Sequence, residues 1–569
     1  MQSKIWSYKP NGLDSASTVS LAEKFHIPKV VAALLLNRGI STEQQIKSYL
    51  QKSLEGVHNP NLLPDMEKAV ARITSALENK EKIVVYGDYD VDGITSTALL
   101  YDFLKNAGAE VDYYIPDRIN EGYGLNIMAV NKISKSGAKL MITVDCGITS
   151  VGEVALANAQ KLDVIVTDHH TCKDKLPEAV AVINPKRPDA EYPFRELAGV
   201  GVAFKLILAL TVAWGQKSRQ CFEKYAEIAA VGTIADVVEL LDENRIIVDR
   251  GLAFLQNTKR PGLKALTEVA GIKNVNATSV AFFLSPRLNA AGRLGSAQTA
   301  VRLLLCDNDH EAYEIAKALD DENRRRQLTE QKIFQEAVEL IDSDPNFEQK
   351  KVIVLAKEGW HHGVIGIVAS RICEKYYRPC ILISHENGVG KGSGRSIAGF
   401  NLFDALTVCK DQLTNFGGHA MAAGLGLNIA DLEAFTAKIN NYAKDRLTPE
   451  DMQRHINIDC TLCPEDVSIR SIALLSRLEP FGMGNEKPVF SLCGLTVQNI
   501  GVMGIDNKHL RLRLTANGRQ FSAVGFGMGG LIQNFRQGDR VDAAFTMEIN
   551  SYQGNEQAQL LLKDIRHSV

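Results

Sequence analysis

The sequence predicts an α/β protein with a parallel-sheet domain, a long connecting helix, a second α/β domain and a C-terminal β-barrel. Three observations predict this class. From residue 80, short apolar runs alternate with helix-like segments; a charged helical stretch covers 307–345; and short alternating strands follow residue 456. A chain of 569 residues is also too long for a single hydrophobic core.

Residues 1–60 are predicted to be a helical N-terminal segment, because "VVAALLLNRG" and "TEQQIKSYL" have helical spacing and a glycine stop. The first α/β domain is expected over 61–306. Its apolar runs predict strands that are buried on both faces, as in a parallel sheet. The strands are expected at 82–87, 110–116, 139–147 and 162–170, and the helices at 95–107, near 125–136 and at 151–160.

The connecting helix is expected over 307–348, and its basic triplet Arg324–Arg326 is interpreted as a solvated face. The second α/β domain is expected over 349–455, with strands at "KVIVLA" and "PCILIS" on either side of a helix through "GVIGIVASRI". The last part, 456–569, has five or six short alternating strands between "HINIDC" and "AQLLLKDI", which predict a small barrel.

The composition excludes several classes of protein. The formal net charge is -3, so the chain is not a polycation that coats nucleic acid. We expect no signal peptide and no membrane span, because the N-terminus lacks an apolar core and no apolar run approaches ~20 residues. The ten scattered cysteines indicate reduced thiols and a cytoplasmic location. Zinc binding by the lone Cys460/Cys463 pair would need further ligands, such as Cys493 and His509.

The stretch "GDYDVDG" places Asp88, Asp90 and Asp92 at alternate positions before a glycine, as in a calcium loop. A loop of the EF-hand type that begins at Asp88 needs an acidic ligand at residue 99, and this position is Leu99. A strand, rather than a helix, is expected to lead into the motif. The sequence therefore argues against calcium.

The strands of the first domain end in polar clusters, and the carboxyl ends of parallel strands share one edge of the sheet. We expect Asp88, Asp90 and Asp92 to converge because alternate residues of an extended segment point to one side. Crowded carboxylates repel one another unless cations offset them, and oxygen ligands with imidazole suit manganese or magnesium. Taken singly, each aspartate could be a turn residue or a helix cap. The other clusters are Asp117/Arg118, Asp145 and Asp168-His169-His170.

These motifs carry a family resemblance. "GDYDVDG", "VDCG", "TDHH" and "VGTIADVVEL" are similar, in order and spacing, to the motifs of the DHH phosphoesterase superfamily. "GRSIAGFNL" and "NFGGHAMAAG" resemble those of its DHH-associated domain. With "IPDRINEGYG", "SPRLNAAGRLG" and "GWHHGVIGIVASR", the chain is similar over nearly its whole length to bacterial single-strand exonucleases of the superfamily. The resemblance implies that the terminal barrel is an OB-fold.

The resemblance implies two divalent metal ions, Mn²⁺ or Mg²⁺, that share Asp145. Asp90 would bind one ion, and Asp92, His169 and Asp236 would bind the other. More distant relatives carry a histidine at the position of Tyr86, and Asp88 is the nearest candidate to replace that ligand.

The same resemblance places His170 at the scissile phosphate. Arg287, Asn289 and Arg293 are suitable types to stabilise developing charge there, beside the catalytic Asp145. The alternative for the arginine pair is that it packs a loop.

Glycines alternate with polar residues in "GVGKGSGRS", residues 388–396, and would let backbone N–H groups approach a phosphate. By resemblance, Ser393 and Arg395 would hold the 5′-phosphate of the DNA, helped by Arg118. Tyr123 could stack on a base, and His419 would contact a backbone phosphate. A glycine-rich turn without a ligand is the alternative.

In "KHLRLRL", His509, Arg511 and Arg513 are predicted to share one strand face, opposite three leucines. With Phe521 and Tyr552 nearby, this face could follow a single strand of DNA. The alternative is a solvated edge strand that its charges protect.

We therefore expect a metal-dependent 5′→3′ exonuclease that hydrolyses single-stranded DNA to mononucleotides in recombination and repair. One alternative is a phosphodiesterase of short oligonucleotides or cyclic dinucleotides, and such enzymes are shorter and lack the barrel. Another is a non-catalytic scaffold that binds single-stranded DNA. The resemblance implies a monomer that works with a single-strand DNA-binding protein and a helicase, without a membrane.

Overall fold

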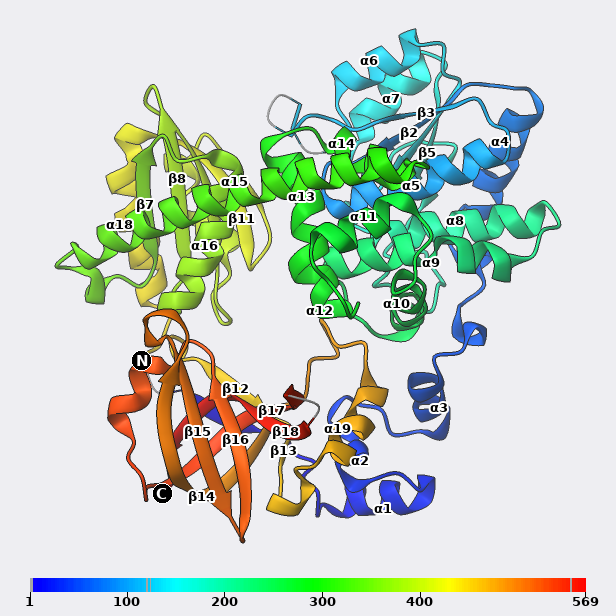
Figure 1. Cartoon of the computed structure of the whole chain (residues 1–569). Coiled ribbons are helices and arrows are strands. Elements are labelled where there is room, and N and C mark those ends of the chain that lie inside the picture. The colour runs from blue at the N-terminus through cyan, green and yellow to red at the C-terminus, as the bar shows by residue number, and fades with distance from the viewer. Residues whose placement is uncertain (1–3, 119–120, 123, 553–554, 569) are drawn as a thin grey trace. The chain divides into compact units, whose positions relative to one another are not determined.

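The computed structural model describes residues 4–118, 121–122, 124–552 and 555–568 (Figure 1). The chain forms two compact units. The smaller unit contains residues 4–6, 293–295 and 320–456, and the larger unit contains 7–292, 296–319 and 457–568.

The larger unit contains a sheet of five parallel strands in the order β3-β2-β4-β5-β6, and its first four strands confirm the predicted ones. The short β6 was not predicted. Because the chain order reverses between β2 and β4, the carboxyl ends of these two strands flank the point where open α/β sheets bind ligands. The strands are β2 (Ile83–Gly87), β3 (Val111–Tyr114), β4 (Leu140–Val144), β5 (Asp163–Thr167) and β6 (Ala181–Ile183).

Both faces of this sheet are covered, which explains its continuous apolar strands. Ile83 and Val85 of β2 pack with α4 (Met66–Glu78), α5 (Val91–Asn106) and α8 (Gly199–Ala213). Val84 and Tyr86 pack with α6 (Ile127–Lys135) and α7 (Val151–Ala159). Further helices complete the first domain: α9 (Ser218–Ala235), α10 (Asp242–Leu255), α11 (Pro261–Val269), α12 (Ala277–Ser279), the π-helix Val280–Leu284, α13 (Ser285–Leu294) and α14 (Ala297–Leu305).

The predicted connecting helix is α15 (Asp309–Asp342), which contributes residues to both units. The expectation of a solvated basic face holds for Arg324, which pairs with Asp320 at 2.8 Å and is largely exposed. It is wrong for Arg326, which is buried and pairs with Glu330 at 2.7 Å. A long side chain covers apolar surface with its stem while its charge is neutralised one turn away.

The smaller unit contains the second α/β block. Its sheet has the order β10-β11-β9-β8-β7, and β9 lies between two antiparallel neighbours. The strands are β7 (Ile353–Glu358), β8 (Cys380–Glu386), β9 (Val389–Arg395), β10 (Asn415–Gly418) and β11 (Ala422–Asn428), with helices α16 (His362–Tyr376), α17 (Leu402–Val408) and α18 (Leu432–Lys444).

The C-terminal strands form the predicted barrel, which closes because β14 pairs with both β15 and β17. "HINIDC" does not belong to it as one strand. Its first part, β12 (His455–Ile458), pairs with β1 (Ile5–Tyr8), and the short β13 (Cys460–Thr461) pairs with β14. The other strands are β14 (Phe490–Met503), β15 (His509–Ala516), β16 (Arg519–Gly525), β17 (Arg540–Tyr552) and β18 (Asn555–His567).

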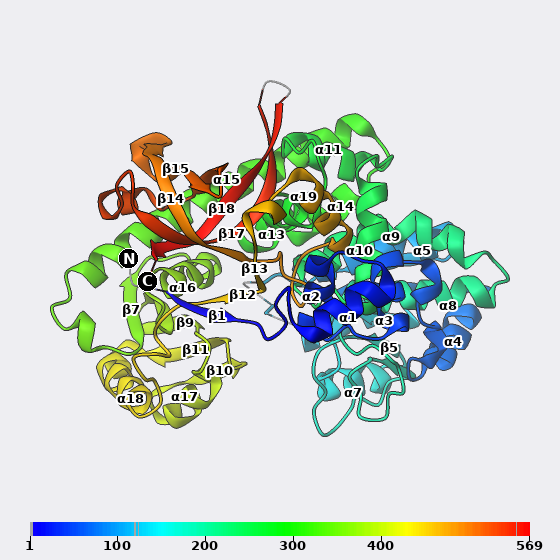
Figure 2. The same cartoon turned by 90° about the horizontal axis from the view of Figure 1, so that it is seen from below.

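The N-terminal helices share a hydrophobic core with the barrel instead of packing alone (Figure 2). These helices are α1 (Ala16–Phe25), α2 (Lys29–Asn37) and α3 (Glu43–Gln51), and α19 (Ile469–Leu475) contributes Leu475 to the same core. Leu34 and Leu35 of α2 are fully buried in the cluster that contains Phe490 and Leu478. Strand β1, ahead of these helices, was not predicted.

A buried ion pair connects α8 and α10. Lys205 Nζ lies 2.9 Å from Glu243 Oε2, both side chains are fully buried, and Tyr192 also donates to Glu243. Burial lowers the pKa of Lys205, so its charge depends on this partner.

We predict that Glu243→Ala lowers the free energy of unfolding by roughly 3–5 kcal/mol, because it leaves the Lys205 ammonium buried without its counter-ion. Urea-induced unfolding followed by circular dichroism measures this loss. The control is Glu223→Ala on α9, whose partner Arg219 is exposed. Equal effects of the two substitutions would contradict the prediction.

Candidate active site

The carboxyl ends of β2, β4 and β5 bring the predicted ligands together. Asp88 follows β2, Asp145 follows β4, and His169 follows β5. Asp236 joins them from the C-terminal end of α9. The cluster therefore lies at the reversal of strand order between β2 and β4, the position at which open α/β sheets bind ligands.

Among the described residues, three groups have ligand atoms that all lie within 4.8 Å of one another. One group consists of carboxylates alone, and the other two combine carboxylates with one or two imidazoles. No cysteine belongs to any of them. Neighbouring groups share residues, so the cluster is one continuous set of donors. The groups are Asp88, Asp90 and Asp145; Asp92, His169 and Asp236; and Asp145, His169 and His170.

The aspartates of "GDYDVDG" converge for a different reason from the one predicted. The extended strand ends at Gly87, and α5 begins at Val91, four residues earlier than expected. Asp90 is the N-cap of α5 and accepts a hydrogen bond from Gly93 N–H (3.0 Å). Asp92 lies in the first turn, so alternate spacing along an extended segment does not bring these carboxylates together.

Asp92 is fixed by the N-terminus of another helix. Its Oδ2 and Oδ1 accept hydrogen bonds from the N–H groups of Gly199 (2.6 Å) and Val200 (2.7 Å), in the first turn of α8. The unpaired amides and the dipole of a helix N-terminus both stabilise a carboxylate. The sequence did not reveal Gly199 as part of the site; the glycines of "AGVGVAF" beside an apolar helix were the available signal.

Asp145 occupies the centre of the cluster. Its φ of 60° lies in the left-handed region, and its Oδ1 lies 3.2 Å from Nε2 of His169. A Cβ at Gly199 would come within 2.5 Å of Asp145 Oδ1, so only glycine fits there. The structure thus places both α8 and His169 directly against the predicted bridging carboxylate.

The cluster lacks the positive charge that its carboxylates need. Several buried atoms have no hydrogen-bond partner, namely Asp88 Oδ1, Asp145 Oδ1, His169 Nε2 and Asp236 Oδ2. Burial, followed by the neighbouring carboxylates, raises the pKa of Asp92 to about 7 and that of Asp236 to about 9. Burial lowers the pKa of His169 to about 3, so its imidazole is neutral and free to act as a ligand. These donors fit hard divalent cations.

Asp168 is not in any of these groups, and its role was not predicted. It accepts hydrogen bonds from the N–H groups of Ile148 (2.8 Å), His169 (2.7 Å) and His170 (3.0 Å). It also lies 2.7 Å from Nδ1 of His170, whose side chain is 40% exposed. Burial opposes the effect, yet the bond to Asp168 raises the pKa of His170. Asp168 therefore orients the partly exposed His170 imidazole beside the cluster.

Arg118 and Tyr86 lie beside the cluster in different ways. The Arg118 guanidinium stacks over the ring of Tyr89, 4.8 Å from its centroid. Tyr86 is buried among α6 and α7, and its hydroxyl donates to the carbonyl of Gly124 (2.8 Å), so its side chain does not join the ligand groups. Asp88 belongs to one of these groups, with Asp90 and Asp145. The predicted Tyr123 lies outside the described residues.

The residues predicted to stabilise charge lie on α13. A Cβ at Gly292 would come within 2.4 Å of the Tyr89 carbonyl, so α13 packs directly against the aspartate motif. Asn289 is half-buried on this helix. Arg287 donates to the carbonyl of Phe283 (2.7 Å), and Arg293 donates to that of Gly363 (3.0 Å). Both arginines therefore have backbone partners.

In the smaller unit, Ser393 and Arg395 lie side by side on β9, with Arg395 Nη1 3.2 Å from Ser393 Oγ. The expectation that the glycines of this stretch leave N–H groups open to a phosphate is wrong. Strand β9 is paired on both sides, and side chains of Ile383 and Leu425 fill the space beside Gly392. His419 is exposed in the turn between β10 and β11.

On the barrel, Arg511 and Arg513 are exposed and the alternating leucines are buried, as predicted. Strand β15 has neighbours on both sides, which excludes the edge-strand alternative. Phe521 is wrong as a stacking residue, because it is buried in the barrel core. Phe526, 62% exposed and 5.1 Å from His509, is the aromatic residue available there. The side chain of Tyr552 lies outside the described part.

Among the described residues, no group of potential metal ligands includes Cys460 or Cys463. Cys460 is buried, whereas Cys463 and Cys493 are exposed. The proposed fourth ligand, His509, accepts a hydrogen bond from Gly527 N–H through Nδ1 (3.0 Å).

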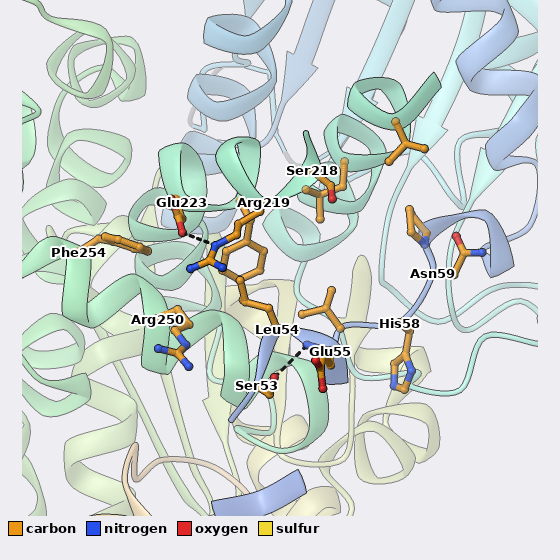
Figure 3. Close-up of a pocket in the computed structure, with 15 residues that line it drawn as sticks. Ser53, Leu54, Glu55, His58, Asn59, Ser218, Arg219, Glu223, Arg250 and Phe254 are labelled. Carbon is orange, nitrogen blue, oxygen red and sulfur yellow. Dashed lines mark hydrogen bonds and ion pairs between the residues drawn. The ribbon is translucent and has the colours of Figure 1, made fainter. Parts of the chain in front are cut away.

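Figure 3 shows a separate pocket of about 540 Å³ between the segment 53–60 and helices α8, α9 and α10. Its charged side chains include Arg219, which pairs with Glu223. None of the predicted site residues line it, so it is distinct from the acidic cluster. Within the described ranges, no helix has the length and apolar character to cross a membrane.

Comparisons with known proteins agree with this organisation. Three family models match the chain: "DHH family, N-terminal domain" over 82–233, "DHHA1 domain" over 349–445 and "RecJ OB domain" over 458–564. The chain is 40% identical to the single-stranded-DNA-specific exonuclease RecJ of Bacillus subtilis, across 97% of this chain and 70% of that protein. It is 35% identical to RecJ of Escherichia coli, across 95% of this chain and 96% of that protein.

A solved structure is similar over almost the whole chain. The crystal structure of RecJ in complex with Mn²⁺ from Thermus thermophilus matches with a TM-score of 0.85 and 33% identity, across 99% of this chain and 80% of that one. The likeness includes the parallel-sheet domain, the second α/β domain and the closed barrel.

We predict that the metal-free protein loses stability as pH rises from about 6.5 to 9, above the range in which the depressed pKa of His169, about 3, acts in the opposite direction. The folded pKa values of Asp92, about 7, and Asp236, about 9, exceed the unfolded value near 4. Their contribution is therefore complete below the unfolded pKa and is lost as pH rises through the folded ones. Thermal midpoints in a chelator at pH 6.5 and pH 9 measure the loss.

Asp236→Asn should reduce this loss between pH 7 and 9, because it removes the carboxyl with the higher pKa. Asp112→Asn, at an exposed aspartate of β3, is the control. Added Mn²⁺ should raise the wild-type midpoint most at high pH, where the ligands are deprotonated. A midpoint that does not change with pH in the chelator would contradict the prediction.

Proposed function

The chain belongs to the RecJ family of single-stranded-DNA-specific exonucleases, and from this premise we propose that it releases mononucleotides from the 5′ end of single-stranded DNA in recombination and repair. One observation carries the proposal. Two groups of potential metal ligands, Asp88/Asp90/Asp145 and Asp92/His169/Asp236, adjoin each other at the strand-order reversal of the sheet, and in each group two of the three residues are buried.

Two divalent ions, Mn²⁺ or Mg²⁺, would be held by these residues, with Asp145 as the shared ligand. Asp88 and Asp90 would complete one site, and Asp92, His169 and Asp236 the other. When bound, such a pair supplies an activated water and offsets the charge that develops on the phosphate. The absence of hydrogen-bond partners at Asp145 Oδ1 and Asp236 Oδ2 supports these assignments.

The residues around the cluster would bind and orient the reacting phosphate. His170, held by Asp168, would present its partly exposed imidazole to the phosphate beside the cluster. Arg287, Asn289 and Arg293 of α13 would stabilise negative charge, which the close packing of α13 against Tyr89 supports.

Other residues would hold the rest of the DNA. Ser393 and Arg395 would bind the 5′-phosphate, with Arg118 from the larger unit and His419 at a backbone phosphate. Tyr123 would stack on a base. Arg511 and Arg513 would contact the strand on the barrel, which their exposure on an interior strand supports.

We also propose the division of labour along the chain. Residues 61–306 would carry out hydrolysis, 307–348 would connect, 349–455 would bind the DNA end and 456–569 would bind the strand, with 1–60 attached to the barrel core. We further propose a cytoplasmic monomer that cooperates with a single-strand DNA-binding protein and a helicase. The family is the support for these partners.

Single-stranded DNA labelled at either end tests the activity and its direction in the presence of Mn²⁺. We expect early release of the 5′ label as a mononucleotide. Asp145→Ala should lower the rate of cleavage by more than about 100-fold, while binding of the strand persists. Loss of a residue that only supports a metal ligand already lowers activity by up to about 100-fold, and Asp145 is proposed as a ligand itself. Asp112→Ala is the control. Release from the 3′ end would overturn the direction, and an active Asp145→Ala would remove the bridging role.

Arg395→Ala should reduce the preference for a 5′-phosphate by about tenfold or more, because it removes a charged hydrogen bond to phosphate. Competition between 5′-phosphorylated and 5′-hydroxyl DNA of one sequence measures the preference. Lys438→Ala, on α18 of the same unit, is the control. An unchanged preference would place the phosphate pocket elsewhere.

A further inference from the structure

The buried Tyr86 connects the interior strand β2 to the segment that follows β3. Its hydroxyl donates to the Gly124 carbonyl (2.8 Å) and accepts from Nδ2 of Asn126 (3.3 Å). The ring is fully buried beside α6, so the position of the hydroxyl is fixed by the sheet. Tyr86 thus holds the C-terminal end of segment 117–126.

Tyr114 holds the other end of the same segment. It pairs with Tyr86 across β2 and β3, and the two rings stack with centroids 5.6 Å apart and planes at 11°. The Tyr114 hydroxyl donates to Oε1 of Glu121 (2.7 Å), and Oε2 of Glu121 accepts from Asp117 N–H (3.0 Å). Glu121 N–H in turn donates to the Asp117 carbonyl (2.8 Å), so Glu121 closes the turn that begins at Asp117.

Arg118 is the next residue in this turn. Its guanidinium lies over the ring of Tyr89, between Asp88 and Asp90 in the sequence. The backbone of Arg118 is therefore set by the Glu121 turn, and its side chain is set by Tyr89. An arginine on a surface turn otherwise loses considerable conformational freedom when it binds a ligand, and fixing it beforehand removes that cost.

We propose that Tyr86, Tyr114 and Glu121 form an anchor of positioning residues that holds Arg118 beside the acidic cluster, ready to bind a phosphate of the DNA end. The inference rests on the proposed function, because it assigns the anchored arginine to the substrate of that site. The anchor would act through Arg118.

Tyr86→Phe and Tyr114→Phe each remove one hydroxyl and keep the stacked ring. For 5′-phosphorylated single-stranded DNA with Mn²⁺, we expect KM to rise about three- to tenfold, the effect of losing one hydrogen bond, with kcat within about twofold of the wild type. The preference for 5′-phosphate over 5′-hydroxyl DNA should fall. In an Arg118→Ala background, Tyr86→Phe should cause no further change, because the two residues act as one unit.

Tyr113→Phe is the matched control. Tyr113 is the neighbour of Tyr114 on β3, but its ring packs on the opposite face, edge-on to Tyr101 at 5.3 Å. It should leave KM and the preference unchanged. Glu121→Gln provides a second route, since it weakens the turn without altering the buried rings, and it should raise KM as the tyrosine variants do.

An unchanged KM and preference in Tyr86→Phe, Tyr114→Phe and Glu121→Gln would overturn the anchor, even where Arg118→Ala impairs binding. Additive effects of Tyr86→Phe and Arg118→Ala would also overturn it. Failure of the proposed function is a separate result: the wild type would then not cleave the DNA. In that event, fluorescence anisotropy with 5′-phosphorylated DNA still measures whether the anchor variants weaken binding as Arg118→Ala does.

Discussion

The mutual repulsion of buried carboxylates at the ends of β2 and β4 is the constraint on which the rest of the site depends. Asp88, Asp92 and Asp145 are almost fully buried, so water cannot screen their charges. The backbone offsets part of the repulsion: Gly93 donates to Asp90, and Gly199 donates to Asp92. Other carboxylate oxygens remain without donors, and bound cations would offset the repulsion where these carboxyls are ionised.

This constraint also determines the backbone around the cluster. Asp145 takes a left-handed conformation that non-glycine residues seldom adopt, and α8 begins with a glycine because its Cβ would collide with the Asp145 carboxylate. The motif "VDCG" and the start of α8 are therefore coupled, although some fifty residues separate them in the sequence. Asp168 has a different environment: it accepts three backbone hydrogen bonds and serves to orient His170.

The side chains packed around a residue, more than its sequence motif, determine its role in this protein. Alternate glycines in β9 look like a phosphate loop in the sequence, but they admit the side chains of Ile383 and Leu425 into the sheet core. On the barrel, Phe521 and Phe526 are five residues apart on one strand and the turn that follows it. The first lies in the core, on strand β16, and the second is exposed just past the end of that strand.

The sequence by itself determined the order of the domains, most strands and the set of acidic residues at the ends of the parallel strands. These features are local, because the spacing of apolar residues reports which face of an element is buried. Only the tertiary structure decided that Asp92 sits on a helix and is capped by α8, that Asp168 orients His170, and that β1 pairs with β12. Such contacts join residues that are far apart in the chain. The distances between these residues are set by the packing of whole helices and strands, which no local sequence pattern records.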